Sequence, residues 1–159
     1  MVSHAFKSLI FFITMTVTLF ACAGSSEPKN KMKLYYGHYE VVDIERYSGG
    51  LTTIEQAKQR IGDKITICPT IFSDFVSNIK PPVYKMEVEK VEKEEGVVPP
   101  KNSVFYGFMP ERDFIHYIEV FKTIDAKYFY TRYEVIGQNK LMKSFDGFFY
   151  KVDKIASCQ

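Results

Sequence analysis

Apolar and polar residues alternate along most of the chain after residue 34, and this pattern predicts β-strands. The clearest case is residues 84–88, where an aromatic or aliphatic residue alternates with Lys or Glu, as in a strand with one face in water. The same pattern predicts eight strands, at residues 35–44, 64–72, 84–88, 104–108, 114–122, 129–135, 141–145 and 148–152. Short connections favour an antiparallel up-and-down sheet, and eight strands are enough to close a barrel without free edges.

One segment, residues 53–61, has helical rather than strand periodicity. Thr53 can cap this helix, and Gln56 completes a capping box. Asp146-Gly147 is the strongest turn signal in the chain, because this pair favours the two-residue type I′ turn of a β-hairpin. We therefore expect a mainly β domain at residues 34–159, an up-and-down antiparallel barrel of about eight strands with one short helix after the first strand.

The first 21 residues differ from the rest of the chain. They contain one lysine, Lys7, and no acidic residue, and residues 9–21 form a run of thirteen without a charge. A membrane-spanning helix needs about 20 apolar residues, so this run is short for one. A charged start, a short apolar run and small residues at its end are typical of a secretory signal peptide. We expect residues 1–21 to be an export signal and residues 22–33 to be a flexible tether.

Two cleavage sites compete at the end of this signal. Residues 19–22, Leu-Phe-Ala-Cys, resemble the lipobox of bacterial lipoproteins, which implies lipidation of Cys22 and a lipid anchor on the periplasmic face of a membrane. Residues 21–23, Ala-Cys-Ala, also fit the small-x-small pattern of an ordinary signal peptidase site, which implies free secretion. Both alternatives place the protein in the cell envelope or outside the cell.

The chain has three cysteines, and either cleavage leaves Cys68 and Cys158 to be explained. An exported protein meets an oxidising compartment, in which these two thiols can form a disulfide. The alternative is a pair of free buried thiols. Cys158 lies one residue from the C-terminus, where a lone buried thiol has little core to join, and this favours the disulfide.

Charge and motif content exclude several functions. Lys and Glu are interspersed, and the basic stripe that nucleic acid binding requires is missing. His38 and His116 do not have the spacing of zinc ligands, and there is no Cys-x-x-Cys pair. A nucleophile elbow and a glycine-rich phosphate loop are also missing. We therefore expect no metal, no cofactor, no nucleic acid partner and no enzymatic activity.

Aromatic residues are abundant, with 14 Phe, 11 Tyr and no Trp. They permit two interpretations: a filled barrel core, or a half-polar pocket in which tyrosine hydroxyls meet a ligand. On the second interpretation, the candidate ligand-lining residues are Tyr84, Tyr106, Phe108, Phe129, Tyr133 and Tyr150. The charged segment at residues 85–95 is likewise either a solvated strand face or an electrostatic docking patch.

The order of these elements resembles the lipocalin-like superfamily. Residues 37–39, Gly-His-Tyr, are similar to the Gly-x-Trp that opens lipocalins. The resemblance also implies a disulfide from the C-terminal segment to an early strand. A closer similarity, over most of residues 37–154, is to a group of small uncharacterised bacterial secreted proteins and lipoproteins. It rests on TTIEQA at 52–57, IGDKI at 61–65, PVY at 82–84 and DGFFY at 146–150.

Together these observations predict an exported, membrane-tethered, lipocalin-like lipoprotein that binds a small apolar or amphipathic ligand without catalysis. The alternative is a protein-interaction module of the cell envelope, such as an inhibitor, an immunity protein or an assembly factor. On that alternative, the charged loop at residues 89–101 would contact the partner protein.

Overall fold

The computed structural model describes residues 31–158. The predicted export signal, Cys22 and most of the predicted tether lie outside the described residues. Within residues 31–158, every helix is too short or too polar to cross a membrane.

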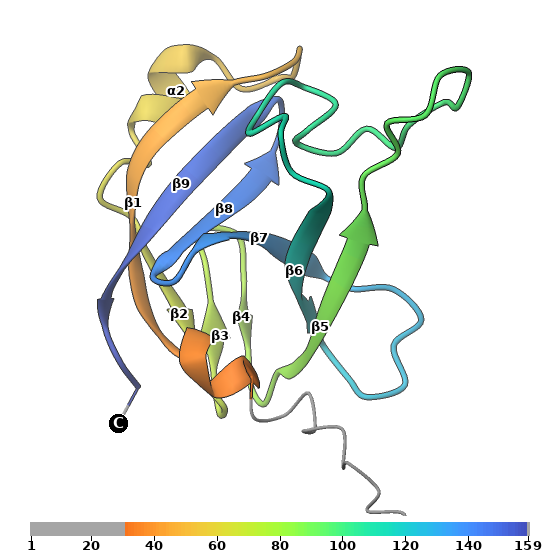
Figure 1. Ribbon diagram of the computed structural model, residues 1–159. Helices are drawn as coiled ribbons and strands as arrows, with labels where there is room; N and C mark the ends of the chain where they lie inside the picture. The colour runs from red at the N-terminus through yellow and green to blue at the C-terminus, as the bar shows by residue number, and fades with distance from the viewer. Residues whose placement is uncertain (1–30, 159) are drawn as a thin grey trace, which may run out of the picture.

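Nine antiparallel strands form one curled sheet, a half-barrel (Figure 1). They are β1 (Gly37–Arg46), β2 (Lys64–Ile67), β3 (Phe72–Ser73), β4 (Asn78–Ile79), β5 (Val83–Lys90), β6 (Phe114–Phe121), β7 (Thr131–Gly137), β8 (Lys140–Phe145) and β9 (Phe148–Ala156). A 3-10 turn, η1 (Lys33–Tyr35), and a short helix, α2 (Ile54–Lys58), lie at opposite ends of the sheet.

The strand order is β4-β3-β2-β1-β9-β8-β7-β6-β5. Every neighbouring pair is consecutive in the chain except β1 and β9, whose pairing brings the last strand back to the first. This is the order of an up-and-down barrel that stays open between β4 and β5. The prediction of a mainly β, antiparallel, barrel-like fold with one short helix after the first strand is therefore confirmed at this level.

The predicted count of eight strands is wrong, and so is the predicted closure of the barrel. The single strand expected at residues 64–72 is interrupted after Ile67 by a turn, in which the backbone N–H of Cys68 donates to the carbonyl of Ile71 at 2.9 Å. Pro69 lies in this turn and has no N–H to extend a ladder. β4 has only two residues and is followed by Pro81 and Pro82, so it offers β5 little to pair with.

The strand predicted at residues 104–108 is also wrong, because these residues form turns. The backbone N–H groups of Gly107 and Phe108 donate to the carbonyls of Val104 and Ser103, both at 2.9 Å. Gly107 has φ +86°, which a strand does not allow. Local hydrogen bonding therefore replaces the expected ladder.

Two local predictions are confirmed in detail. In α2, Thr53 Oγ1 accepts from the N–H of Gln56 at 3.2 Å, and Gln56 Oε1 accepts from the N–H of Thr53 at 2.9 Å, although the helix is shorter than the predicted range 53–61. Asp146 and Gly147 form the two-residue turn between β8 and β9, with φ values of +46° and +84° as a type I′ turn requires. A Cβ at Gly147 would lie 2.7 Å from the carbonyl oxygen of Ser48, so a side chain is excluded there.

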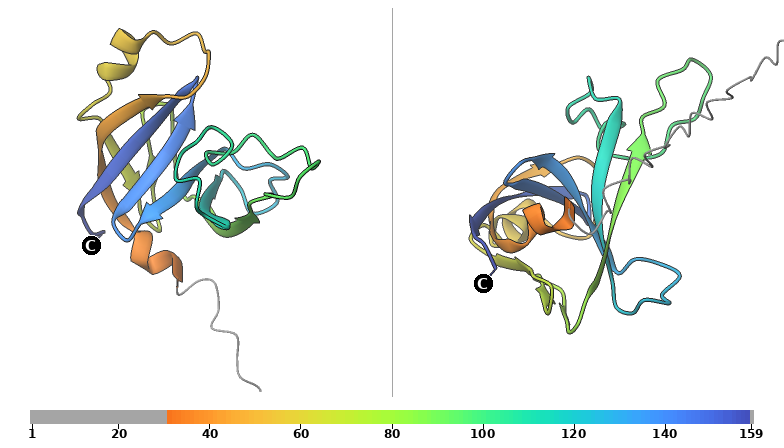
Figure 2. Two further views of the ribbon diagram at one scale, coloured as in Figure 1. Left: turned by 45° about the horizontal axis from the view of Figure 1, so that its top comes forward. Right: turned by 60° about the horizontal axis from the view of Figure 1, so that its bottom comes forward.

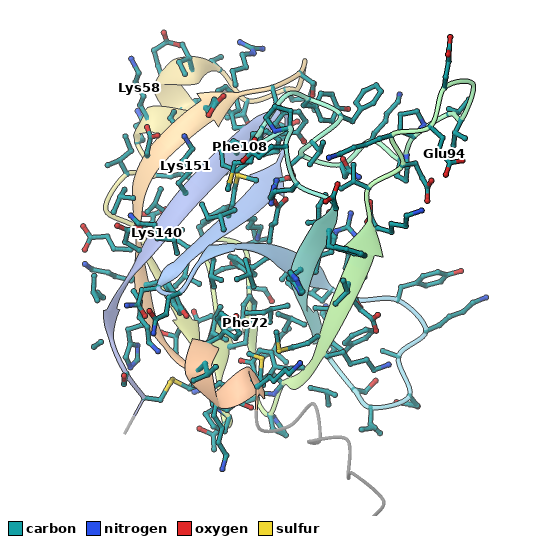
Figure 3. The ribbon with its side chains drawn as sticks, viewed as in Figure 1. Lys58, Phe72, Glu94, Phe108, Lys140 and Lys151 are labelled. Carbon is teal, nitrogen blue, oxygen red and sulfur yellow. A yellow bond between two sulfur atoms is a disulfide. The ribbon has the colours of Figure 1, made fainter. Side chains whose placement is uncertain are left out.

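Apolar side chains fill the interior of the curled sheet, and Figure 3 shows Phe72 among them. The buried cluster includes Tyr39, Val41, Ile65, Ile67, Phe72, Ile118, Val120, Tyr133, Leu141, Phe148, Tyr150 and Val152. Three of these are tyrosines with no exposed surface. The axis of the half-barrel is therefore occupied by the protein's own side chains, as happens in small barrels.

The open side of the half-barrel is bridged by contacts other than strand pairing. The hydroxyl of Tyr84 on β5 donates to the carbonyl of Cys68 at 3.0 Å. Cys68 in turn forms a disulfide with Cys158, across a sequence separation of 90. The predicted disulfide is thus confirmed, and it attaches the C-terminal segment to the end of β2.

We expect the free energy of unfolding to fall as the pH rises above about 10. Burial raises the pKa of Tyr39, Tyr84, Tyr117 and Tyr133 above the usual tyrosine value. Unfolded phenols lose their protons near pH 10 while the buried ones keep them, so the folded state binds more protons and loses stability as pH increases. Burial lowers the pKa of Lys143, and this single group acts in the opposite direction.

Urea unfolding at about pH 8 and about pH 10.5, together with a tyrosinate absorbance titration, would measure this effect. We expect the buried tyrosines to ionise only together with unfolding. Ionisation of all 11 tyrosines near pH 10 in a still-folded protein would contradict the prediction.

Candidate ligand-binding site

Strands β7 and β8 pair over only part of their lengths. Their ladder runs from Gly137↔Lys140 to Glu134↔Met142 and ends there. Beyond that point, residues 131–133 pair with β6, whereas residues 143–145 pair with β9. The two strands therefore separate within the wall of the half-barrel, and Figure 1 shows β7 turning away from β8.

A cavity of about 360 Å³ lies where these strands separate. Its lining comes mainly from the start of β7 and the residue before it, from residues 142–145 of β8, and from part of the long connection between β5 and β6. That connection folds over the outer side of the sheet, where Phe108 packs on Phe149 with ring centroids 5.7 Å apart. Figure 3 places Phe108 near Lys151 of β9 on the same side. The cavity is thus a lateral opening in the wall and is distinct from the filled axis.

Aromatic rings form one side of the cavity. Tyr47 stacks on Phe149 with centroids 4.2 Å apart and contacts Tyr106 at 4.6 Å. Tyr106 also makes an edge-to-face contact with Phe105, with ring centroids 5.1 Å apart. Flat apolar surfaces of this kind can accept the face of a ring or a short acyl chain.

A cation, Arg132, also lines the cavity. Its guanidinium lies 4.1 Å from the ring centroid of Tyr117 and 5.4 Å from that of Phe129, so the aromatic rings hold it in place. The nearest carboxylate is Glu89, at 3.9 Å. Glu119 lies directly opposite Arg132 in the pairing of β6 with β7 and is a second nearby carboxylate. At 3.9 Å the contact with Glu89 is longer than a hydrogen bond, so the guanidinium N–H groups can still donate to a ligand in the cavity.

A buried ion pair neutralises the acidic group in the lining. Glu134 is almost fully buried and accepts a hydrogen bond from Nη1 of Arg112. The same guanidinium donates to Ser103 Oγ at 3.0 Å and to the carbonyl of Phe108 at 3.1 Å. Arg112 thereby fastens residues 103–108 to the outer face of β7 and leaves Glu134 without net charge toward the cavity.

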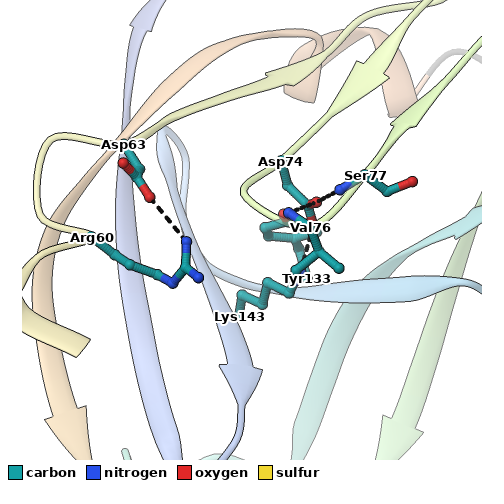
Figure 4. Close-up of polar contacts among 7 residues, drawn as sticks. All are labelled: Arg60, Asp63, Asp74, Val76, Ser77, Tyr133 and Lys143. Carbon is teal, nitrogen blue, oxygen red and sulfur yellow. Dashed lines mark hydrogen bonds and ion pairs between the residues drawn. The ribbon is translucent and has the colours of Figure 1, made fainter. Parts of the chain in front are cut away.

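A second buried ion pair lies on the inner side of the cavity (Figure 4). Lys143 Nζ donates to Oδ2 of Asp74, which lies in the turn between β3 and β4. Oδ1 of Asp74 accepts the N–H groups of Val76 and Ser77, both at 2.9 Å, and Oδ2 also accepts the hydroxyl of Tyr133 at 3.3 Å. Both carboxylate oxygens of Asp74 therefore have hydrogen-bond donors within the protein, and Lys143 neutralises the negative charge.

The six candidate ligand-lining residues fall into three groups. Tyr106 and Phe129 line the cavity. Tyr84, Tyr133 and Tyr150 pack in or against the interior cluster, and the hydroxyl of Tyr150 has no hydrogen-bond partner among the described residues. Phe108 packs on the outer face of the sheet, against Phe149. The prediction that Tyr106 and Phe108 point inward from a strand is wrong, because both belong to turns outside the sheet.

The sequence pattern does not indicate several of the residues that line the cavity. Arg132, Glu134 and Lys143 lie on strands, where alternating charges are typical of a solvated face. The ion-pair partners of Glu134 and Lys143 are Arg112 and Asp74, which lie 22 and 69 residues away in the chain. No local pattern indicates such pairs, although Asp74 followed by Ser77 is compatible with the turn they form.

One further cluster has metal-ligating residue types. The side-chain donor atoms of His38, Cys68 and Cys158 lie within 4.8 Å of one another, and they are the one such group found within residues 31–158. Both sulfur atoms are joined in the disulfide, and Nδ1 of His38 lies at hydrogen-bond distance, 3.1 Å, from Oγ1 of Thr66. The cluster is therefore explained by the disulfide.

No protein-family model, curated protein or solved structure matches this chain.

Proposed function

We propose that the protein is an exported, lipocalin-like binding protein, tethered to a membrane by lipid on Cys22, and that it binds a small amphipathic ligand without catalysis. The observation that carries this proposal is the aromatic cavity of about 360 Å³ between β7 and β8, with Arg132 at its side. Because side chains fill the axis of the half-barrel, the proposed ligand would occupy this lateral cavity.

The size and lining of the cavity support a small organic ligand. Ligand sites in proteins have volumes of roughly 300–1,000 Å³, with mostly apolar walls and a few polar groups that orient the ligand. Here Tyr47, Tyr106 and Phe149 supply the apolar surface, and Arg132 supplies a charged donor.

The charge balance of the lining selects an acidic ligand. Glu134 and Lys143 are neutralised by Arg112 and Asp74, respectively. Within the described residues, Lys101 takes part in no ion pair, and Arg132 has only the long contact with Glu89 at 3.9 Å. A guanidinium matches the planar geometry of a carboxylate. The favoured ligand therefore has a flat apolar body and one acidic group.

The fluorescent probe 1-anilinonaphthalene-8-sulfonate has this chemistry, and N-phenyl-1-naphthylamine has the same ring system without the acid. We expect the sulfonate to bind with one-to-one stoichiometry, and Arg132→Gln to weaken its binding about tenfold, as the loss of a charged hydrogen bond implies. The neutral probe should bind the wild type and Arg132→Gln equally. Fluorescence titration at neutral pH measures all four affinities.

The matched control is Arg46→Gln, which removes an exposed guanidinium on β1, outside the cavity lining. It should leave both affinities unchanged. Near-ultraviolet circular dichroism must show native packing in each variant, because the sulfonate also binds partly unfolded proteins. Equal sulfonate binding by the wild type and Arg132→Gln would refute the assignment of Arg132.

The alternative function, a protein-interaction module of the envelope, is supported by a different observation. β5 lies at one end of the sheet order and carries exposed charged side chains along an edge that no strand within residues 31–158 pairs with. An edge of this kind can extend its pairing to a second chain.

A further inference from the structure

The edge of β5 is free along its length. β5 pairs with β6 from Val83↔Phe121 to Lys90↔Phe114, and within residues 31–158 no strand pairs with its other side. Figure 2 shows the β5–β6 pair diverging from the rest of the curled sheet. The free edge presents unpaired backbone N–H and C=O groups that can continue the ladder into another polypeptide.

The side chains along this edge are exposed and charged in alternation. Lys85 and Glu87 lie on one face, and Val88, which is 56% exposed, lies on the other. Within the described residues, neither Lys85 nor Glu87 takes part in an ion pair. Burial and the nearby carboxylate of Glu87 raise the pKa of Glu119, while Arg132 and Lys85 act on it in the opposite direction. Lys85 lies directly opposite Glu119 in the pairing of β5 with β6, so Glu87 is the less compensated of the two charges.

The order of these charges makes β5 complementary to itself. In an antiparallel pair, residues directly opposite each other share a face and their side chains interact. If two copies of β5 pair about Met86, Lys85 of each copy lies opposite Glu87 of the other. The same register places each Tyr84 opposite a Val88 and covers the exposed valine.

Neighbouring registers that keep the same faces together are unfavourable. A shift of two residues in one direction places Glu87 opposite Glu87. It also brings Lys85 opposite Glu89, but Glu89 already accepts a hydrogen bond from Asn102 and lies 3.9 Å from Arg132. The same shift in the other direction places Lys85 opposite Lys85. Like charges directly opposite each other destabilise a strand pair. One register therefore satisfies all four charges, which favours a second copy of this chain over an unrelated peptide.

We propose that two copies of the protein form a two-fold symmetric dimer through antiparallel pairing of their β5 strands about Met86. The sheet of each copy then continues into the other, and the same surface serves both copies, as two-fold symmetry requires. The lining of the lateral cavity includes no residue of β5, so the dimer and ligand binding can be tested with different variants.

The test measures the mass of the purified protein, isolated from cells that express the full sequence, by sedimentation velocity over a range of concentrations. We expect the mass to double as the concentration increases, and the dimer to weaken at high salt because exposed ion pairs are screened. Lys85→Glu and Glu87→Lys should each weaken the dimer at least about tenfold, since each places like charges opposite one another twice.

Two rescue experiments separate this interface from general damage to the fold. The double variant Lys85→Glu/Glu87→Lys exchanges the charges and should restore the dimer. An equimolar mixture of the two single variants should form a mixed dimer, because one copy then carries two negative charges and the other two positive charges at the paired positions. Lys127→Glu, an exposed change in the connection between β6 and β7, is the control and should leave dimerisation unchanged.

A wild-type protein that stays monomeric at every concentration overturns the proposal. So does a dimer that the single variants leave intact, or one that neither the double variant nor the mixture restores. Each of these outcomes leaves the ligand-binding proposal standing, because it is measured with different variants and different probes.

Discussion

Replacing Lys143 by methionine is expected to lower the free energy of unfolding by about 3–5 kcal/mol. The side chains of Lys143 and Asp74 are 5% and 0% exposed, and they form an ion pair inside the half-barrel. Methionine has a similar length, so the change leaves little empty volume. It does leave the carboxylate of Asp74 buried with only the hydroxyl of Tyr133 and two backbone N–H groups as donors. The expected cost is therefore that of an uncompensated buried charge.

Urea unfolding at neutral pH, followed by circular dichroism, measures this loss. Lys140→Met is the matched control, because it removes the exposed ion pair with Asp153, whose side chains are 58% and 37% exposed. The control should cost at most about 1 kcal/mol. Adding Asp74→Asn to Lys143→Met should recover part of the loss, since the amide has no charge to bury. Equal losses in Lys143→Met and Lys140→Met would show that the pair is not buried as described.

Removing the disulfide by Cys158→Ala is expected to lower the free energy of unfolding by about 4–5 kcal/mol. The bond joins residues 90 apart in sequence, so it strongly limits the conformations of the unfolded chain. Alanine at position 158 leaves the thiol of Cys68 in place and creates little empty space, because Cys158 is only partly buried. The effect therefore arises mainly from the unfolded state.

Urea unfolding with and without a thiol reductant tests this prediction. Reductant should lower the stability of the wild type to that of Cys158→Ala and should not change the variant. A difference below about 1 kcal/mol between the oxidised wild type and the variant would contradict the expected contribution. We also expect faster amide hydrogen exchange in the last residues of β9, which the disulfide holds close to the end of β2.

Local signals in the sequence predicted local structure well. The alternation at residues 84–88 lies within β5, the Thr53–Gln56 capping box starts α2, and Asp146-Gly147 forms the hairpin turn. Each depends on residues within a few positions of one another, whose preferences hold in most surroundings. The predictions that failed, at residues 64–72 and 104–108, failed where Pro69 or the turn at Gly107 outweighed the alternation.

The cavity could be predicted only in part. The sequence predicts Tyr106 and Phe129 as ligand-lining residues of the barrel interior, and the structure places both at the lateral cavity, outside the axis of the half-barrel. The separation of β7 from β8 has no marker in either strand, because it depends on where each strand finds its other neighbour. The charged lining residues resemble solvated strand positions until their distant partners are placed beside them.

The amino-acid sequence by itself determined the mainly β, antiparallel character of this protein, its short capped helix and its final hairpin, and it favoured the pairing of Cys68 with Cys158 over two free thiols. These follow from backbone preferences of neighbouring residues and from the small number of cysteines. Only the tertiary structure decided that the tyrosines fill the axis, that β4 and β5 leave an open edge, and that Asp74 neutralises Lys143. These features depend on which segments, far apart in the chain, pack together inside the curled sheet. Close packing and the cost of burying polar groups act on all of these segments together, so no local stretch of sequence indicates the result.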